Sequence, residues 1–257
     1  MSVITLTTDF GIQEPYVAMT KGVCLQVAEA CRVIDISHQV APYAIGQAAY
    51  LVRQAYPSFS ANTLHLVLVH LFDRPEPRLL LARFRGHWFV VPDNGLLSLL
   101  FQPLPEVVHE IGSYSGGFQE LLACVRKVVL HWHAQDAPDT WAKVVSRVEE
   151  KMWLHPTVTA HQIKGNIVHI DRFGNAVVNI HQILFEEVGN GRPFQFHFRP
   201  HERITRISTQ YADVPEGQPL LLFNAAGFLE IAVRTGQAAS LLNLHLDDAV
   251  QLDFLQP

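Results

Sequence analysis

Ionisable side chains crowd the segment VHLFDRPEPR, residues 69–78, where the apolar run LHLVLV ends. The apolar run is typical of a buried strand, so the polar residues stand where that strand stops. His70 is the first of them, and a neutral imidazole can take a proton from water. Asp73, Arg74 or Arg78 would then orient it. The same residues could also begin a solvated loop, and the segment alone does not decide between the two interpretations.

Two further segments carry groups that suit a small polar ligand. Asp9 follows the β-branched run VITLTT, at the edge of an α/β sheet where small ligands bind. A carboxylate has two accepting oxygens, which suit a pair of neighbouring sugar hydroxyls, but a turn or capping role explains Asp9 equally well. The turn DRFGN, residues 171–175, joins an acceptor, an aromatic ring, a flexible residue and an amide. By itself it is also an ordinary hairpin turn.

Several familiar chemical signatures are absent from the sequence. It has no phosphate-binding Gly-rich loop, no G-x-S-x-G motif and no H-E-x-x-H motif. His131 and His133 are spaced i and i+2, so they do not share a helix face, and we interpret them as histidines near a helix end. Three cysteines suit neither a disulfide framework nor a close metal-ligand spacing. We expect no metal site.

The first half of the chain alternates strand-like and helix-like segments, which predicts a mainly parallel sheet covered on both faces. The strand-like segments are VITLTT, RVIDIS, TLHLVLV and HWFVVPDNG, and the helix-like segments are YVAMTKGVCLQVAEAC and YAIGQAAYLVRQAYPSF. A further helix is predicted from Pro138, because Trp141, Val145, Val148 and Met152 form one apolar stripe.

The second half has a different pattern, with short strands separated by turns such as VGNGRP and VPEGQP. This pattern is typical of a small all-β domain, and many short strands of this kind favour closure into a barrel. We therefore predict an α/β fold with two domains. Residues 1–157 form an N-terminal, mainly parallel α/β sandwich domain, and residues 158–257 form a smaller C-terminal β-barrel domain.

The composition limits the function classes. Hydrophobic residues make up 49% of the 257 residues, charged residues 17%, and the net charge is −5, as in a globular chain without a nucleic-acid-binding basic surface. The apolar runs are shorter than the roughly 20 residues of a membrane helix. The start MSVITLTTDFG lacks the pattern of a signal peptide. We expect a cytoplasmic protein that binds neither nucleic acid nor membrane.

Five motifs occur in an order that is more specific than any one of them: TLTTDFGIQEPYVAMTKGV, VIDISHQVAPYAIGQAAYLV, VVPDNGLLS, VHIDRFGNAVVNI and NAAGFLEIAVRTGQAA. From Val3 to Ala239 the chain resembles the adenosine-forming S-adenosylmethionine hydrolases, relatives of the fluorinating and chlorinating enzymes. The resemblance implies an α/β domain followed by a β-barrel domain. It also implies a homotrimer that holds the adenosyl ligand between the N-terminal domain of one subunit and the C-terminal domain of its neighbour.

The resemblance also implies roles for single residues. Asp9 would bind the ribose hydroxyls, Phe173 and Asn175 would line the nucleoside pocket, and Tyr43 would stack on the ligand or be a half-buried core tyrosine. Glu230 and the backbone near Val233 would help to hold the amino-acid and adenine ends. The other substrate-binding residues that the motifs contribute are Phe10, Asn94, Asp171 and Phe228. The reaction needs no cofactor, because the sulfonium makes methionine a good leaving group.

The chain departs from the family where water is activated. The family segment V-D-P-G-V-G-x-x-R-R supplies an Asp and an Arg, but here His70 and Pro77 occupy those positions and Arg78 matches only the second Arg. A later family His is replaced by Gly117. One interpretation makes His70 a substitute base, with Arg78 as its partner. The alternatives are a catalytically silent homologue that binds an adenosyl compound or nucleoside, and a trimeric scaffold. We favour the hydrolase.

Overall fold

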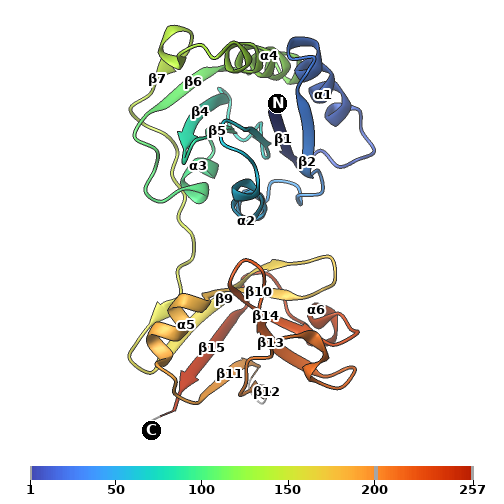
Figure 1. Cartoon of the computed structure of the whole chain (residues 1–257), viewed down its shortest axis with the longest axis vertical. Coiled ribbons are helices and arrows are strands. Elements are labelled where there is room, and N and C mark those ends of the chain that lie inside the picture. Colours follow the sequence, from blue (N-terminus) through green and yellow to red (C-terminus); the bar gives the residue numbers. More distant parts are fainter. Residues whose placement is uncertain (1, 200–201, 256–257) are drawn as a thin grey trace. The chain divides into compact units, whose positions relative to one another are not determined.

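The computed structural model describes residues 2–199 and 202–255 of the chain, and these form two compact units, Met1–Trp153 and Leu154–Pro257. Each unit contains its own sheet (Figure 1). The sequence placed the domain boundary between residues 157 and 158, and the structure divides after Trp153. Within the described ranges, no helix has the length and apolar character needed to cross a membrane.

Unit 1, Met1–Trp153, is a sheet with helices on both faces. Its strands lie in the order β2-β1-β3-β5-β4-β6-β7. The strands are β1 (Val3–Thr8), β2 (Arg32–Ser37), β3 (Leu64–Leu68), β4 (Arg78–Phe84), β5 (His87–Pro92), β6 (Val108–Ser113) and β7 (Lys143–Val144). The helices are α1 (Tyr16–Val27), α2 (Ile45–Ala55), α3 (Leu96–Leu100) and α4 (Phe118–Ala134), with short 3₁₀ helices η1 (Tyr56–Ser58) and η2 (Pro138–Thr140).

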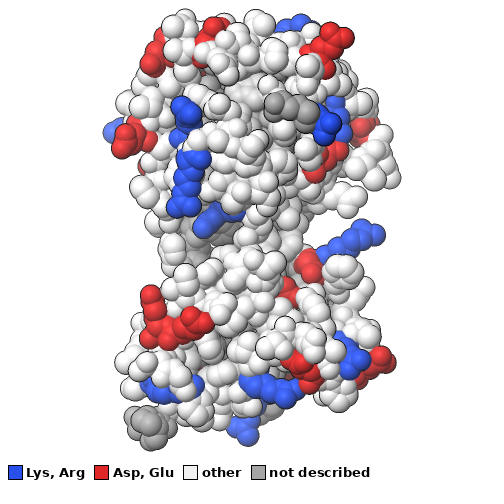
Figure 2. Space-filling model, in the orientation of Figure 1, with Lys and Arg blue, Asp and Glu red and all other residues white. Residues whose placement is uncertain are grey.

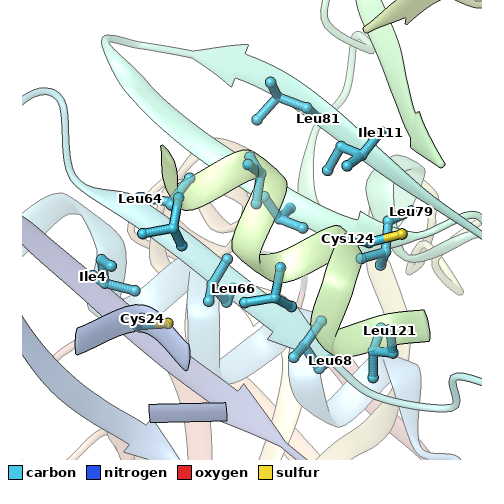
Figure 3. Packing of buried hydrophobic residues seen from close by; sticks show 14 of the residues in the cluster. Ile4, Cys24, Leu64, Leu66, Leu68, Leu79, Leu81, Ile111, Leu121 and Cys124 are labelled. Atoms are coloured by element: carbon cyan, nitrogen blue, oxygen red, sulfur yellow. The ribbon is translucent and has the colours of Figure 1, made fainter. Parts of the chain in front are cut away.

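The sheet of unit 1 is buried on both faces, which confirms the predicted α/β sandwich. Alternate residues of β3 point to opposite faces, so Leu66 and Val67 belong to different hydrophobic clusters. Helices α1 and α4 cover the first face and α2 and α3 the second. In Figure 3, Leu66 and Leu68 of β3 cluster with Leu121 of α4. Continuous apolar runs are what a doubly covered sheet requires.

The sheet is parallel on one side and antiparallel on the other. Strands β1, β2, β3 and β5 pair in parallel, whereas β4 pairs antiparallel with both β5 and β6. The turn between β4 and β5 explains the change, because Arg85 and Gly86 have φ values of 47° and 84°. Two consecutive residues with positive φ make the tight turn that joins hairpin strands.

The helix predicted from Pro138 is wrong beyond its first turn. Only η2 is helical, and the following residues run extended along unit 1. Their amides bond to distant groups: Val145 N–H donates to the Val108 carbonyl at 2.9 Å and Glu149 N–H to Asp93 Oδ1 at 2.7 Å. Val145 and Val148 pack against the α2–α3 side of the sheet, while Met152 is 86% exposed. Tertiary packing, not a helix face, explains the apolar spacing.

Unit 2, Leu154–Pro257, is a nearly closed, barrel-like antiparallel sheet, which confirms the predicted β-barrel. Its strands lie in the order β12-β11-β15-β9-β10-β14-β13, with β8 paired to β9. A bridge from Ile207 to Leu221 joins the chain after β12 to β13. The elements are β8 (Thr157–Val158), β9 (Gln162–Ile170), β10 (Ala176–His181), α5 (Gln182–Gly189), β11 (Phe194–Arg199), β12 (Glu202–Ile204), η3 (Tyr211–Asp213), β13 (Pro219–Phe223), β14 (Phe228–Val233), α6 (Ala238–Leu241) and β15 (Ala249–Phe254).

A buried histidine makes the stability of unit 1 depend on pH. His65 of β3 is fully buried, its Nδ1 lies 2.7 Å from Thr5 Oγ1, and its ring stacks on Phe89. Burial, followed by the nearby His87, lowers the pKa of His65 to about 3. Below pH 6.5, His65 therefore binds a proton in the unfolded chain but stays neutral in the folded chain. The contribution of His65 to the unfolding free energy is complete above that pH and is lost as the pH falls.

Between pH 7 and pH 5 we expect His65 to cost about 2 kcal/mol of unfolding free energy. Urea unfolding of the parent chain and of His65→Leu at both pH values measures this contribution. The variant should lose less stability over the interval than the parent. Equal losses in both proteins would show that His65 is not responsible.

Candidate functional site

Three predicted site residues of unit 1 follow adjacent parallel strands. Asp9 comes directly after β1, His70 lies two residues beyond β3, and Asn94 lies two residues beyond β5. Because β3 pairs in parallel with both β1 and β5, the carboxyl ends of the three strands meet at one edge of the sheet. That edge is the usual ligand-binding edge of an open α/β sheet. The sequence position of each residue thus determines its place in the site.

Asp9 and Asn94 shape the corner at which His70 lies. Asp9 Oδ2 accepts hydrogen bonds from the backbone N–H of His70 at 3.0 Å and of Tyr43 at 3.2 Å. The Asn94 amide donates to the carbonyls of Val69 and His70 at 3.0 and 2.9 Å. His70 and Tyr43 have φ values of 54° and 68°, a conformation that side chains other than glycine adopt at a cost. The hydrogen bonds that Asp9 accepts and Asn94 donates stabilise this strained backbone.

A cavity of about 570 Å³ opens at this edge. Its size falls in the range of small-molecule sites. It is lined by Asp9, Phe10, Tyr16, Pro42, Tyr43, His70, Leu71, Phe72 and Phe118. Phe10, Tyr16 and Phe118 form one edge-to-face aromatic cluster, with ring centroids 4.7–6.0 Å apart. Of these lining residues, the sequence predicted Asp9, Phe10, Tyr43 and His70 but not the others. Asn94 is fully buried and is not among the residues that line the cavity. It contributes indirectly, through its hydrogen bonds to the backbone of Val69 and His70.

His70 presents an imidazole to this cavity. Its ring lies edge-on to Tyr43, with centroids 5.2 Å apart. Nδ1 is buried and has no hydrogen-bond partner among the residues that the structure describes. Asp73 and Arg74, proposed as orienting groups, are 3.6 Å from each other, and Arg74 is also 3.6 Å from Glu149. The imidazole is therefore not committed to a structural ion pair.

Arg78, which was predicted to be catalytic, is not among the residues that line the cavity. Its guanidinium bonds to Asp93 Oδ2 at 2.7 and 2.8 Å, to Glu110 Oε2 at 2.8 Å and to the Arg147 carbonyl at 3.0 Å. The Asp93 side chain is only 2% exposed, so it requires a charged partner. Because Arg78 begins β4, which pairs with β5 and β6, it points into this network. We interpret Arg78 as a structural residue.

Gly117 stands where the family has a histidine, and the structure gives this segment a capping role. Gly117 has a φ of 99° and precedes α4. Glu120 in the first turn of α4 accepts a hydrogen bond from the Gly116 N–H at 2.7 Å. A carboxylate at this end of a helix satisfies a free amide and interacts favourably with the helix dipole.

A second cavity of similar volume, about 560 Å³, lies elsewhere in unit 1. Trp88, Trp132 and Trp141 contribute to its lining, beside Val3 at the start of β1. None of the predicted site residues lines it. His131, which we interpreted as a histidine near a helix end, stacks on Trp141 with centroids 4.6 Å apart and pairs with Asp136. Across residues 2–199 and 202–255, no group of three or more potential ligands is arranged to hold a metal ion.

In unit 2, the side chain of Asp171 organises the DRFGN turn. Its Oδ1 accepts hydrogen bonds from the N–H groups of Phe173 and Asn175, both at 2.8 Å, and its Oδ2 accepts one from the Asn175 amide at 3.2 Å. Gly174, at a φ of 78°, lets the chain turn back. Phe173 is consequently 73% exposed, whereas Asn175 is 6% exposed. The turn presents an aromatic ring on a rigid base.

Glu230 of β14 is a buried carboxylate in unit 2. It is 4% exposed and accepts a hydrogen bond from the Tyr211 hydroxyl at 2.9 Å. Burial raises the pKa of Glu230, and the charge of Asp171 adds to this effect, while the bond from Tyr211 opposes it. Burial and Glu230 together raise the pKa of Tyr211 to about 12. Tyr211 was not predicted from the sequence, because it begins the short 3₁₀ helix η3, which carries no recognisable motif.

The other two predicted residues of unit 2 lie at opposite ends of β14. Phe228 begins the strand and packs edge-on against His181, with centroids 5.2 Å apart. Val233 ends the strand, and its carbonyl accepts a hydrogen bond from the Gly236 N–H at 3.0 Å. Asp171 and Glu230 interact electrostatically. Within β14, Glu230 lies between the two ends, two residues after Phe228 and three before Val233.

One face of the molecule carries charged side chains of both signs (Figure 2). On the face shown in Figure 2, acidic and basic side chains are interspersed with uncharged ones over both units. A mixed surface does not generate the strong single-sign potential that steers highly charged ligands. Recognition by this face would rest on local contacts.

The chain is similar to proteins of known name over nearly its whole length. It is 27% identical to the (R)-S-adenosyl-L-methionine hydrolase of Methanocaldococcus jannaschii, covering 98% of this chain and 96% of the relative. It is also 27% identical to the Thermus thermophilus protein of that name, covering 95% and 96%. A fluorinase of Actinoplanes sp. is 22% identical, covering 94% of each chain.

Solved structures share the fold. A crystal structure of an uncharacterized conserved protein from Thermotoga maritima has a TM-score of 0.84 and 23% identity, covering 97% of this chain and 99% of that chain. Residues 4–137 match the model of the SAM hydroxide adenosyltransferase N-terminal domain, and residues 165–251 match that of its C-terminal domain. The chain therefore belongs to the SAM hydroxide adenosyltransferase family.

Proposed function

We propose that the protein hydrolyses S-adenosylmethionine to adenosine and methionine. Two relatives that it matches over 96% of their length are named (R)-S-adenosyl-L-methionine hydrolase. The observation that carries the proposal is the cavity at the carboxyl ends of β1 and β3, where Asp9 and an uncommitted His70 lie together. A nucleoside fits the volume of this cavity and its aromatic lining.

In this proposal Asp9 binds the ribose. Its Oδ2 already accepts two backbone N–H bonds, and no described residue donates to Oδ1. Oδ1 is thus the oxygen for the ribose hydroxyls. Tyr43, at 70% exposed, supplies a ring at the rim for the adenosyl group. The cavity holds C5′, the carbon bonded to the sulfonium sulfur, next to the attacking water. This removes much of the entropic cost of bringing the two together.

The reaction is a substitution at carbon. The water oxygen forms a bond to C5′ as the bond from C5′ to sulfur breaks, and the electron pair of that bond returns to sulfur to give the neutral thioether of methionine. His70 takes the proton that the water loses and passes it to solvent. No redox step occurs, so the proposed reaction includes no redox cofactor.

We further propose that the protein works as a homotrimer, with unit 2 of a neighbouring copy closing the cavity. Exposed aromatic rings support this arrangement, because Tyr43 and Phe72 of unit 1 and Phe173 of unit 2 are 70%, 53% and 73% exposed. Large apolar side chains that gather at a surface commonly mark an interaction site. Phe173, Asn175 and Glu230 would then meet the ligand from the neighbouring copy.

Replacing Asp9 by alanine should weaken adenosine binding by about 1–3 kcal/mol, since a charge-assisted hydrogen bond is lost. Isothermal titration calorimetry with adenosine measures the change. Glu29→Ala, which removes an exposed carboxylate of the same unit outside the cavity lining, is a control for net charge. Unchanged affinity in Asp9→Ala would remove Asp9 from the site.

The experiment that tests the function is incubation of the purified protein with S-adenosylmethionine. Chromatography with mass spectrometry should find adenosine and methionine in equal amounts, above a blank that corrects for spontaneous breakdown. The replaced family positions, Pro77 and Gly117, favour one second candidate, a silent homologue that binds the adenosyl group. Adenosine binding without product would establish that candidate and refute the hydrolase.

A further inference from the structure

The loop after Asp9 is attached to His38 at two points. Gly11 N–H donates to the His38 carbonyl at 2.9 Å. Phe10 N–H donates to Thr8 Oγ1 at 3.3 Å, and the same oxygen lies 2.9 Å from His38 Nδ1. Thr8 is fully buried and His38 is 8% exposed. The two amides that follow Asp9 therefore both depend on His38, one directly and one through Thr8.

The contacts of His38 determine which groups donate and which accept in this series of hydrogen bonds. His38 Nε2 lies 3.0 Å from Asp35 Oδ1, and Lys21 Nζ lies 2.6 Å from Asp35 Oδ2. The first contact has the distance of an ion pair but not the angle of a hydrogen bond. A carboxylate only accepts, so it favours the tautomer with the proton on Nε2, which leaves Nδ1 as an acceptor. The Thr8 hydroxyl then donates to Nδ1 and accepts from Phe10.

The arrangement of Asp35, His38 and Thr8 has the order of a hydrolase triad, but it does not serve as one. The Thr8 hydroxyl belongs to a residue with no exposed surface, so no substrate atom can reach it. The Thr8 hydroxyl instead accepts a hydrogen bond from the backbone N–H of Phe10, the residue after Asp9. From the other side, the N–H groups of Tyr43 and His70 hold Asp9 Oδ2.

We propose that His38 is a positioning residue for the site: acting through Thr8, it sets the backbone of Phe10 and Gly11 and thereby the orientation of Asp9 toward a nucleoside. The proposal rests on the proposed binding of an adenosyl compound at Asp9. His38 touches no ligand in this account. It acts on affinity, because the carboxylate that it orients binds the ribose and not the reacting carbon.

Strand β1 offers a matched control. Thr5 is also fully buried, and its Oγ1 lies 2.7 Å from Nδ1 of another histidine, His65. Thr5→Val and Thr8→Val therefore each remove one buried Thr–His bond from the same strand. Only Thr8 is bonded to the loop that follows Asp9. General weakening of the strand would affect both variants alike.

We expect Thr8→Val to raise the Kd for adenosine and the KM for S-adenosylmethionine about five- to tenfold, with kcat changed less than twofold. Thr5→Val should leave all three within twofold, and Thr8→Ser, which keeps the hydroxyl, should restore the parent values. His38→Leu should act like Thr8→Val, and the double variant should be no worse than either alone. Equal effects of Thr5→Val and Thr8→Val, or no effect of Thr8→Val, would overturn the proposal.

Hydrogen exchange separates this proposal from the proposed function. The amides of Phe10 and Gly11 should exchange about tenfold faster in Thr8→Val than in the parent chain and at the parent rate in Thr5→Val. This readout needs neither ligand nor turnover. If the parent chain neither binds adenosine nor forms product while these amides respond as expected, the function fails and the positioning stands. Unchanged exchange in Thr8→Val would refute the positioning itself.

Discussion

Replacing His70 by asparagine is expected to lower the rate of adenosine formation by about two to four orders of magnitude, the usual cost of losing a positioned base. Asparagine is the informative substitute because residue 70 has a φ of 54°, a conformation that asparagine tolerates better than alanine. The backbone N–H of residue 70 also continues to bond Asp9. The variant therefore removes the imidazole and leaves the corner intact.

Steady-state kinetics with S-adenosylmethionine and calorimetry with adenosine together check this prediction. The rate of adenosine formation should fall by the amount given above, because an asparagine side chain cannot act as a base. The affinity for adenosine should stay within about threefold of the parent value, because asparagine preserves the shape of the pocket. His133→Asn, an exposed histidine near the end of α4, provides the control and should keep the parent rate. A His70→Asn variant that retains most of its activity would show that another group, or none, activates the water.

The second large effect concerns stability and not catalysis. Arg78→Met should lower the unfolding free energy by about 3 kcal/mol, since it leaves the buried Asp93 carboxylate without its cation. Asp93 would keep only the Glu149 N–H as a partner on its other oxygen. Methionine preserves the length of the side chain, so the loss reports on charge more than on packing. Chemical denaturation of the two proteins measures the difference.

Arg83→Met on the same strand is the matched comparison. Arg83 lies over the Trp88 ring at 5.2 Å, a contact worth about 0.5–1 kcal/mol at an exposed position. The change should therefore cost much less than Arg78→Met. If Arg78→Met instead unfolds like the parent chain but has lost its turnover, Arg78 belongs to the catalytic machinery and our structural interpretation is wrong.

The sequence predicted most of the fold because its strands are apolar runs bounded by turns. The elements that escaped prediction were those without a pattern of their own. Strand β4 follows a proline-rich loop, and its antiparallel direction depends on the positive φ of Arg85 and Gly86, which sequence alone does not reveal. The helix expected from Pro138 failed because its apolar residues pack against the sheet from an extended chain.

The site was predicted only in part. The sequence shows which residues stand next to the end of a strand, but it does not show which distant residues meet them in the folded chain. Asp9 and His70 were found because each stands next to the end of a strand, which is visible in the sequence. Tyr16 and Phe118 reach the cavity from the starts of two helices, and nothing in their neighbourhood distinguishes them from core aromatics. The partners of Arg78 could not be predicted, because Asp93 and Glu110 are distant from it in sequence and meet it only in the folded sheet.

The most direct test of the claim that water attacks C5′ is to run the reaction in water enriched in ¹⁸O. The mass of the adenosine that forms is then measured by mass spectrometry. If water attacks C5′, as we propose, the adenosine carries one ¹⁸O at its 5′ position and the methionine carries none. Adenosine without the label would mean that the oxygen came from elsewhere, and the absence of adenosine above the enzyme-free blank would contradict the hydrolase altogether.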